Sequence, residues 1–339
     1  MKVLVDFHHG YLYGSLKMLF EDRLGFEMYR PLGMDWFTQG YFKVAEPYNN
    51  AQDTLDQYLA IDSRPYDSMK SLNGNYKLED NIYHIYDPEN NITHKAITFD
   101  QFKEMQFDLI VASHPLHECW EGLLQYQPKA KFVMQLGNDG QETNARNVLS
   151  SVWATSPKHG QNMCYYHQEF PLKYLGWSEP QNKNMINSFV HLLPEADTYH
   201  IYKSSLPEFD FHAFGMQTPD GIPTKSSMIN LMKESTFGWH IKPADGYGHL
   251  LHQWYACGRP VITRGDYYLF KTGGMLLTDG ETCIDLDRHS FEDNIKLIKY
   301  WSEPENNLKM CLNAMDRFNK VCDFNAEADK IKTFLSNIL

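Results

Sequence analysis

Short apolar runs alternate with helix-like patterns along this chain, and this alternation constrains its fold more than any other feature. Strand-like runs cover residues 2–7, 107–113, 130–137 and 151–156, and residues 15–25 carry an apolar stripe at helical spacing. Strands that alternate with helices form parallel sheets that helices cover on both faces. The first half of the sequence therefore predicts a doubly wound α/β domain.

A segment typical of a linker separates this half from a second one. Residues 171–185 are rich in Pro, Gly, Asn and Lys, and the alternation then restarts and runs to an expected strand over 273–279. The 339 residues also exceed the usual size of a single hydrophobic core. We predict two Rossmann-like domains that face each other across a cleft, where the carboxyl ends of their strands bind ligands.

The expected domain boundaries follow from the linker and from the amphipathic end of the chain. The first domain covers residues 1–180, with an insertion at about 38–100, and the second covers 181–318. The last helix, within residues 319–339, is expected to pack back toward the first domain.

Charge and composition exclude some classes of protein. The formal net charge is −12 and no run of five or more Lys or Arg occurs, which disfavours binding along a nucleic-acid backbone. A nucleic-acid acceptor held by one local basic patch stays open. No apolar stretch approaches the roughly 18 residues of a membrane helix, and the first apolar run is too short for a signal peptide. Six widely spaced cysteines without a C-x-x-C pair indicate reduced thiols, so we expect a cytoplasmic protein with no integral membrane segment.

The segment ADGYGHLLHQWYACGRPVI, residues 244–262, joins a glycine-rich turn to a short helix and an apolar strand. Counted at about 100° per residue from Gly248, the helix has one apolar arc. The opposite arc carries His249, His252 and Gln253. Because the apolar arc packs on the domain, the polar arc is expected to face a cleft or solvent.

The turn before this helix suits an anionic ligand. Gly246 and Gly248 let the backbone approach a ligand closely, and the free N–H groups at the start of a helix attract anions. Such a turn can hold a diphosphate without a lysine. On these grounds alone, a glycine turn that only connects a strand to a helix is an equally open interpretation.

Residues 244–263 resemble the nucleotide-sugar signature of GT-B-fold glycosyltransferases, in particular the large retaining group (glycosyltransferases group 1 type). That signature has an acid, a Gly-aromatic-Gly turn, a second acid eight positions after the first, and Ala-Cys-Gly-x-Pro-Val-Ile. The first acid falls on Asp245 and the second on Gln253, and ACGRPVIT matches closely. The segment KTGGMLLTDGE, residues 271–281, resembles the family's later Gly-Gly loop beside the donor. The resemblance is clear over roughly residues 186–290 and only architectural before them.

The resemblance implies a role for each matching residue. Asp245 is expected to contact hydroxyls of the donor sugar and, with His114 of the first domain, to be catalytic. Gln253 is expected to reach the nucleotide ribose, where its amide hydrogen-bonds without the charge-assisted strength of a carboxylate. The backbone N–H groups of the turn are expected to meet the phosphates. The donor-binding set is Lys242, Gly246, Tyr247, Gly248, His249 and Gln253.

Two features of the sequence depart from the family pattern. The usual pair of glutamates has become an Asp and a Gln. The family also places an Arg and a Lys after the first strand of the second domain, where this chain offers His191 and no aligned cation. Neutralisation of the diphosphate is then expected from the helix dipole or from Lys203, Lys225, Lys242 or Arg264. Lys242 is preferred because it lies beside the motif, and a merely solvated lysine is the alternative.

Polar residues follow three strands of the first domain, where a ligand cleft is expected. His8, His9 and Gly10 come after the first strand and are assigned to an acceptor or phosphate loop; this loop lacks the G-x-G-x-x-G pattern of NAD enzymes. His114 directly follows a strand, where a histidine can donate a proton or bind a sugar hydroxyl. Asp139 is an acceptor-side candidate, against the favoured alternative of a plain Asn-Asp-Gly turn. A structural role is the alternative for each histidine.

These observations predict a glycosyltransferase that moves a sugar from a nucleotide-diphosphate sugar to a glycan, lipid-linked or nucleic-acid acceptor. The resemblance implies retention of configuration. Neither H-x-x-x-H nor H-E-x-x-H occurs, so we expect no metal and no cofactor besides the donor. Three alternatives stay open: a phage-type DNA-modifying sugar transferase, a sugar-nucleotide epimerase of the same architecture, and a catalytically silent sugar-nucleotide binding protein. The changed glutamates and the missing cations motivate the last of these.

Overall fold

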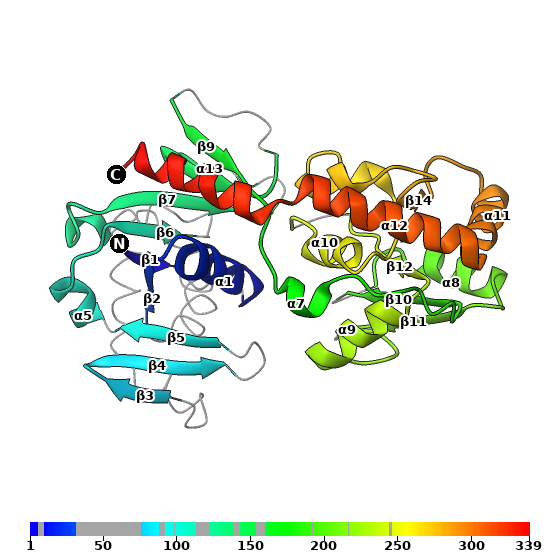
Figure 1. Cartoon of the computed structure of the whole chain (residues 1–339), viewed down its shortest axis with the longest axis horizontal. Coiled ribbons are helices and arrows are strands. Elements are labelled where there is room, and N and C mark those ends of the chain that lie inside the picture. Colours follow the sequence, from blue (N-terminus) through cyan, green and yellow to red (C-terminus); the bar gives the residue numbers. More distant parts are fainter. Residues whose placement is uncertain are drawn as a thin grey trace. The chain divides into compact units, whose positions relative to one another are not determined.

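The structure, a computed structural model, divides into two compact units (Figure 1). Unit 1 consists of Met1–Phe170 together with Phe324–Leu339, and unit 2 of Pro171–Asp323. Each unit contains a sheet with parallel strands and helices, so the α/β class predicted from the sequence is confirmed. The residues that the structure describes are 1–5, 10–31, 76–87, 92–97, 99–112, 123–138, 141, 143–153, 160–190, 193–215, 217–243 and 246–339.

The described strands of unit 1 form a nine-stranded sheet in the order β3-β4-β5-β2-β1-β6-β7-β8-β9. Neighbouring strands are parallel from β5 to β9, whereas β3–β4 and β4–β5 are antiparallel pairs. The strands are β1 (Lys2–Val5), β2 (Glu27–Pro31), β3 (Tyr76–Glu79), β4 (Ile82–Asp87), β5 (Ile92–Ile97), β6 (Leu109–Ala112), β7 (Lys131–Leu136), β8 (Asn147–Ser150) and β9 (Asn162–Tyr165). The helices include α1 (Gly10–Lys17), which continues as a π-helical turn over Met18–Arg23, α5 (Phe99–Glu104) and α13 (Phe324–Ser336).

The antiparallel pair β3–β4 lies within the region that the sequence marked as an insertion. Its two-residue turn consists of Asp80 and Asn81, whose φ angles of 49° and 63° place both in the left-handed region. Asp and Asn adopt this conformation more readily than other residues with a side chain, and such a turn matches the twist of the strands that it joins. A local turn signal therefore accounts for this hairpin.

One strand of unit 1 lies earlier than the sequence pattern predicts. The strand expected over residues 151–156 is β8, which ends at Ser150. The Ser150 hydroxyl donates to the Val152 carbonyl (2.7 Å), and the Ser151 hydroxyl donates to a carbonyl of β7 (3.2 Å). Side-chain hydroxyls that bond to nearby backbone compete with an extended ladder. The predicted position was therefore wrong.

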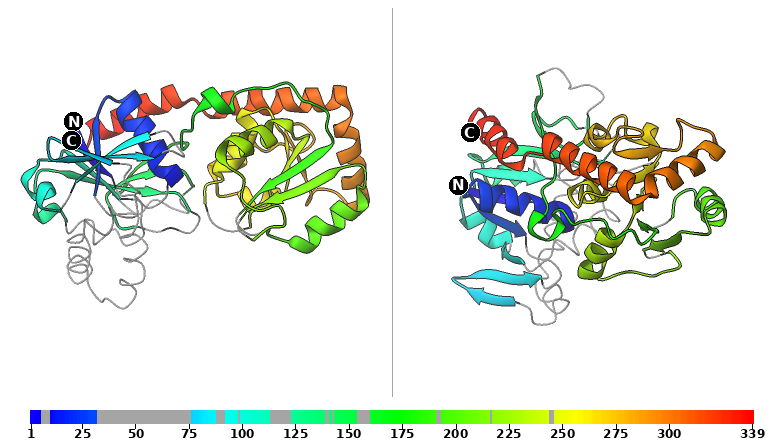
Figure 2. Two further views of the ribbon diagram at one scale, coloured as in Figure 1. Left: turned by 90° about the horizontal axis from the view of Figure 1, so that it is seen from below. Right: turned by 45° about the vertical axis from the view of Figure 1, so that its right-hand side comes forward.

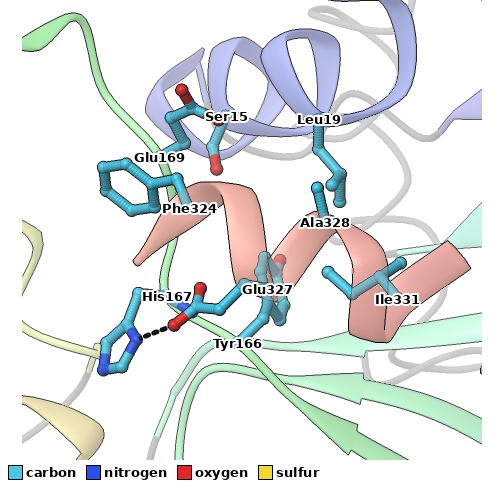
Figure 3. Close-up of a pocket in the computed structure, with 9 residues that line it drawn as sticks. All are labelled: Ser15, Leu19, Tyr166, His167, Glu169, Phe324, Glu327, Ala328 and Ile331. Carbon is cyan, nitrogen blue, oxygen red and sulfur yellow. Dashed lines mark hydrogen bonds and ion pairs between the residues drawn. The ribbon is translucent and has the colours of Figure 1, made fainter. Parts of the chain in front are cut away.

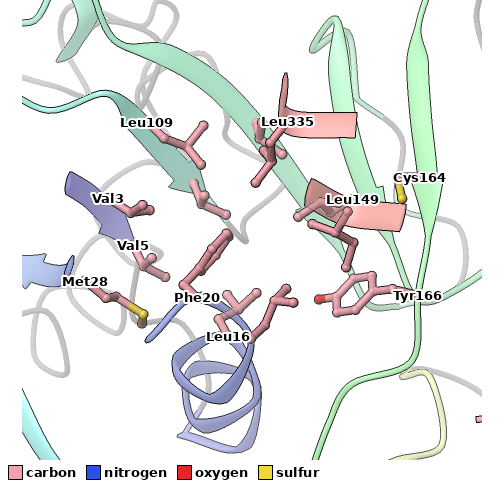
Figure 4. Close-up of a cluster of buried hydrophobic side chains, with 14 of the residues drawn as sticks. Val3, Val5, Leu16, Phe20, Met28, Leu109, Leu149, Cys164, Tyr166 and Leu335 are labelled. Atoms are coloured by element: carbon pink, nitrogen blue, oxygen red, sulfur yellow. The ribbon is translucent and has the colours of Figure 1, made fainter. Parts of the chain in front are cut away.

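The core of unit 1 lies between the sheet and helices from the two ends of the chain (Figure 4). Leu16 and Phe20, from α1 and the turn that continues it, join Leu335 of α13 in one cluster with the strand residues Val5 and Leu149. All five side chains are at most 1% exposed. Burying one such side chain stabilises a fold by about 1.5–3 kcal/mol, so apolar packing holds α13 in this unit.

The five described strands of unit 2 form a parallel sheet in the order β11-β10-β12-β13-β14. The order reverses at β10, because β11 lies on one side of it and β12 on the other. The carboxyl ends of β10 and β12 therefore flank a switch point, the usual ligand position in such sheets. The strands are β10 (Met185–Phe189), β11 (Asp210–Phe214), β12 (Phe237–Trp239), β13 (Val261–Thr263) and β14 (Cys283–Asp285).

Helices pack around this sheet (Figure 2). They are α7 (Leu172–Leu175), α8 (Ala196–Ser205), α9 (Lys225–Glu234), α10 (His249–Ala256), α11 (Phe291–Ser302) and α12 (Pro304–Val321), with two short 3₁₀ helices, η3 (Gly265–Tyr268) and η4 (Thr272–Leu276). Among the described helices of the whole chain, none is both long enough and apolar enough to cross a membrane.

The strand expected over residues 273–279 is not formed there. This stretch begins with η4, and the fifth strand of the sheet, β14, follows it. A Cβ at Gly274 would lie 2.3 Å from the Tyr268 carbonyl oxygen, so the chain folds back on η3 instead of extending. Leu276 is fully buried, which explains why the run is apolar without being a strand. The prediction was wrong because an apolar run shows burial but not backbone shape.

Arg23 bonds both to the segment at which the chain leaves unit 1 and to the segment at which it returns to unit 1. Its Nε and Nη2 donate to the two carboxylate oxygens of Glu169 at 2.5 Å each, and Nη1 donates to Asn325. The guanidinium also lies over the Phe324 ring, 6.0 Å from the ring centre. A bidentate and partly buried arginine–carboxylate pair is stronger than an exposed pair, because the geometry is fixed and solvent screens it less.

We expect Arg23→Met to lower the free energy of unfolding by about 2 kcal/mol, because it leaves the Glu169 carboxylate partly buried without its partner. Urea unfolding followed by circular dichroism measures this change. The control is Lys103→Met, which removes an exposed ion pair with Asp100 in the same unit and should change stability by less than about 0.5 kcal/mol. Equal effects of the two substitutions would contradict the role given to Arg23.

Candidate functional site

The turn before α10 holds its backbone in a conformation that glycine adopts easily and other residues do not. Gly246 and Gly248 have φ angles of 64° and 86°, in the left-handed region. Gly248 is the N-cap of α10, and no side chain in the described part of the chain caps this helix. The first N–H groups of α10 can therefore bond to solvent or to an anion, which the helix dipole favours.

His240 directly follows β12 and is buried at the carboxyl end of the sheet. Its carbonyl accepts a hydrogen bond from the Thr263 hydroxyl (2.7 Å), which ties β12 to β13. Neither ring nitrogen has a hydrogen-bond partner among the described residues. Burial, together with the nearby charges of Lys242 and Lys271, lowers the pKa of His240 to about 3. This histidine is therefore neutral at physiological pH, and two lysines lie within electrostatic reach of it.

Lys271 reaches the same strand end from the loop between β13 and β14. It is only 1% exposed, and its Nζ lies 3.4 Å from the carbonyl oxygen of Lys242. Nζ also lies 5.1 Å from the centre of the Tyr268 ring, in a cation–π contact. The Tyr268 hydroxyl in turn lies 3.4 Å from the His240 carbonyl oxygen. These contacts join the loop to the end of β12.

The glycine pair after Lys271 lets the same loop pack on the turn before α10. A Cβ at Gly273 would lie 3.4 Å from the Tyr247 carbonyl oxygen and 3.2 Å from the side chain of Leu251. The loop and the turn therefore belong to one site. We call it the α10 site, and it comprises His240, Lys242, Gly246, Tyr247, Gly248, helix α10, Tyr268 and Lys271.

Two of the three residues of the polar arc of α10 are buried, whereas the sequence predicts that this arc faces a cleft or solvent. His252 and Gln253 are 0% and 3% exposed. The His252 ring stacks on Tyr247 with ring centres 4.3 Å apart, and its Nδ1 lies 2.9 Å from the Gly248 carbonyl oxygen. His252 therefore supports the turn. Gln253 Oε1 has no hydrogen-bond partner in the described part of the chain, so this oxygen can accept from a ligand hydroxyl.

The structure brings the residues assigned to donor binding into one place. Lys242, Gly246, Tyr247, Gly248, His249 and Gln253 all lie at the α10 site, although their role in binding stays a prediction. Two of the other candidate cations are engaged elsewhere. Arg264 donates to Glu195 (2.8 Å) and forms an ion pair with Asp287, whereas Lys203 Nζ donates to the Phe211 carbonyl (3.0 Å).

Several predicted residues lie outside the described part of the chain, and their roles stay predictions. They are His8, His9, His114, Asp139, His191 and Asp245, together with the side chain of Lys225. Gly10 is the first residue of α1. Neither His240 nor Lys271 was among the residues predicted from the sequence. A signal for Lys271 existed, because it directly precedes the glycine pair that resembles the family's donor loop.

Unit 1 has a small pocket between α1, α13 and the segment after β9 (Figure 3). Beside it, Glu327 accepts hydrogen bonds from the backbone N–H of His167 (2.8 Å) and from its ring Nδ1 (2.5 Å). The pocket volume is about 10 Å³, which is the space of roughly one water molecule. A nucleotide needs a pocket of roughly several hundred Å³, so this pocket does not bind one.

Comparison with solved structures identifies the fold. No protein-family model and no curated protein sequence matches this chain. The structure is similar to that of Alr3699/HepE from Anabaena, solved in complex with UDP, with a TM-score of 0.59 and 11% identity over 99% of this chain and 100% of that one. Sucrose-phosphate synthase from Thermosynechococcus elongatus and a glycosyltransferase from Rickettsia africae each give a TM-score of 0.60, with 11% identity over 99% of this chain and 98% of theirs.

The fold is that of GT-B glycosyltransferases. The resemblance seen in the sequence is thereby confirmed at the level of the fold, over nearly the whole chain and not only over the second half. In the GT-B fold of this chain, the α10 site occupies the carboxyl edge of the unit 2 sheet, next to its switch point. The site therefore lies where ligands bind in such sheets, and its chemistry suits an anion.

The neutral state of His240 predicts a pH dependence of stability. Its pKa is about 3 in the folded chain and near 6.5 when unfolded, so the unfolded chain binds the extra proton between these values. Stability from this group is complete above about pH 6.5 and is lost as the pH falls toward 3, by about 1.4 kcal/mol per pH unit within this window.

We expect His240→Leu to remove this slope, because leucine does not titrate. The measurement is the free energy of urea unfolding between pH 4 and pH 7, for which His200→Leu, on the exposed face of α8, is the control that should keep the slope. An unchanged pH dependence in His240→Leu would show that His240 is not buried in its neutral form.

Proposed function

We propose that this protein is a glycosyltransferase that takes a sugar from a nucleotide-diphosphate sugar held at the α10 site. The observation that carries the proposal is the meeting of two lysines at the carboxyl end of β12 with a helix N-terminus that no side chain of the described residues caps. A diphosphate has the chemistry to match, since its oxygens accept from N–H groups and its charges attract ammonium groups. The two lysines lie together in a chain whose net charge is −12.

The proposed donor nucleotide follows from the similar structures and from the contacts at α10. The HepE structure, which has the same fold, contains UDP, so uridine diphosphate is the first nucleotide to test. Gln253 Oε1, which has no hydrogen-bond partner among the described residues, is proposed to accept a hydrogen bond from a ribose hydroxyl, as the sequence resemblance implies. Asp245 is proposed to contact the donor sugar.

The proposed reaction breaks the bond between the anomeric carbon of the sugar and an oxygen of the diphosphate, and it forms a bond between that carbon and a hydroxyl oxygen of the acceptor. The proton of this hydroxyl leaves with the nucleoside diphosphate. Negative charge then develops on the departing phosphate, where the N–H groups of α10 and the two lysines stabilise it. Because these groups are already oriented, they need little rearrangement during the reaction, and we propose that the transfer needs no metal and retains configuration. His114 is proposed to be catalytic together with Asp245. A role in binding the acceptor or the donor phosphates is proposed for His8, His9, Gly10 and Asp139. The acceptor is a glycan, a lipid-linked acceptor or a nucleic acid.

Ligand-dependent stability tests this proposal. We expect UDP or a UDP-sugar to raise the melting temperature, because a ligand that binds only the folded chain stabilises it by about 2.7 kcal/mol at 100 times its dissociation constant. The effect should persist in EDTA. Calorimetric titrations with UDP-, GDP-, ADP- and CMP-sugars complete the screen. If none of them binds, the proposal is wrong.

The turn offers a matched pair of substitutions. Gly248→Ala and Gly221→Ala both place alanine at a positive φ, 86° and 71°, so each should cost about 1–2 kcal/mol of stability. Only Gly248→Ala distorts the start of α10, and we expect it to weaken nucleotide binding at least about tenfold. Gly221→Ala, whose added Cβ would lie more than 4 Å from every described atom outside its own neighbours, should bind as the wild type does. Equal binding by both variants would remove the turn from the site.

A second candidate function is a catalytically silent protein that binds sugar nucleotides. The observation in its favour is Gln253, an amide where the resembled family has a carboxylate. The two functions differ in turnover: a transferase releases the nucleoside diphosphate from its donor slowly even in water, and a silent binder does not. Binding of a nucleotide sugar without any release of nucleoside diphosphate, with or without glycan acceptors, would favour the silent binder.

A further inference from the structure

The two lysines of the α10 site differ in their contact with water. Lys242 is partly exposed, whereas Lys271 is 1% exposed. Dissolved ions screen interactions between exposed charges, and they screen buried charges much less. At equal distance, a phosphate is therefore attracted more strongly by a buried ammonium group than by an exposed one.

Two further observations indicate that a polar ligand binds at the α10 site, to which Lys271 belongs. The ring nitrogens of His240 and the Oε1 atom of Gln253 have no hydrogen-bond partner among the described residues, and both side chains are more than nine-tenths buried. Buried polar atoms in folded proteins are almost always hydrogen-bonded. A bound ligand with donors and acceptors would supply the partners of these atoms.

Contacts within its loop hold Lys271 near the turn before α10. The backbone N–H of Lys271 donates to the Tyr268 carbonyl (3.1 Å), and the Tyr268 ring lies beside the Lys271 ammonium group. Gly273 lets the loop approach the Tyr247 carbonyl oxygen. The neutral state of His240 also avoids a third positive charge next to the two lysines.

We propose that Lys271 supplies the buried positive charge that holds the donor diphosphate, a role that rests on the nucleotide-sugar function proposed above. Lys271 thereby replaces the Arg and Lys that the resembled family carries after the first strand of its second domain. Lys242 was the preferred residue for this role on the sequence alone. Because Lys242 is partly exposed, water and ions screen its charge, so its contribution to the same site is weaker.

The experiment compares a ligand with phosphates and one without. Binding of UDP and of uridine to Lys271→Met is measured by calorimetry at about 50 and 500 mM NaCl; if another base is preferred, its diphosphate and nucleoside are used instead. We expect UDP affinity to fall at least about tenfold at both salt concentrations, with uridine affinity unchanged. Lys242→Met should lose UDP affinity mainly at low salt. Lys309→Met, on the exposed face of α12, is the control for removing one positive charge from unit 2 and should bind as the wild type does.

The results of these titrations test the role of Lys271 and the proposed function separately. If the wild type binds no nucleotide, the proposed function fails and Lys271 has no such role. If the wild type binds UDP and Lys271→Met binds it equally well, the role of Lys271 is wrong while the function stands. An equal loss of UDP and uridine binding would show a structural role and also overturn the proposal.

If Lys271→Met does not fold, two more conservative substitutions at the same position test the role of the charge. Lys271→Arg keeps the positive charge and Lys271→Gln does not, although both side chains are long and polar. We expect Lys271→Arg to keep the preference for UDP over uridine within about threefold, and Lys271→Gln to lose it. The same preference in both variants would contradict a role of the charge.

Discussion

The packing of Trp254 on Gly238 holds the α10 site in place. Trp254 is fully buried, and a Cβ at Gly238 would lie 2.6 Å from its indole ring, so α10 can approach β12 this closely only because the strand has no side chain there. The indole also stacks on Phe189 of β10, with ring centres 5.4 Å apart. One side chain therefore fixes the helix over the two strands that flank the switch point. The N-terminus of α10, the turn before it and the loop packed on that turn all take their positions from this contact.

The sequence was sufficient for the class of fold because a doubly wound sheet needs only the alternation of strands and helices. That pattern depends on burial, which apolar residues report directly. The pattern predicted wrong strand positions where a segment is buried but its backbone is not extended. The run at 273–279 is apolar because Leu276 fills the core, yet Gly274 folds the loop back on η3, and β14 forms later. Likewise, β8 ends where serine hydroxyls bond to the backbone, a choice that hydrophobicity does not encode.

The candidate site was predictable where its residues are neighbours in the sequence. Gly246, Tyr247 and Gly248 carry a local signal, because left-handed backbone requires glycine and the start of a helix requires a turn. His240 and Lys271 are distant in sequence and meet only because parallel strands end at one edge of a sheet. Pairwise packing across such an edge leaves little trace in a single sequence. The burial of Gln253 was missed for a similar reason, since a helical wheel shows which residues share an arc and not what covers them.

Unit 2 buries a second cation, and its place in the sheet shows why burial alone does not define a ligand site. Arg259 is fully buried, and its guanidinium donates to the backbone carbonyls of Lys233 (2.6 Å), Ser178 (2.9 Å) and Glu179 (3.2 Å). It lies at the amino end of β13, where parallel sheets do not bind ligands. Burial lowers the pKa of Arg259. Its planar guanidinium group donates to backbone carbonyls and so holds the segment at which the chain enters unit 2. Lys271 is also buried, but at the opposite, carboxyl edge, beside a helix that no side chain in the described part of unit 2 caps. Since strand direction distinguishes the two cations, the topology of the sheet separates a cation that supports the fold from one positioned to meet an anion.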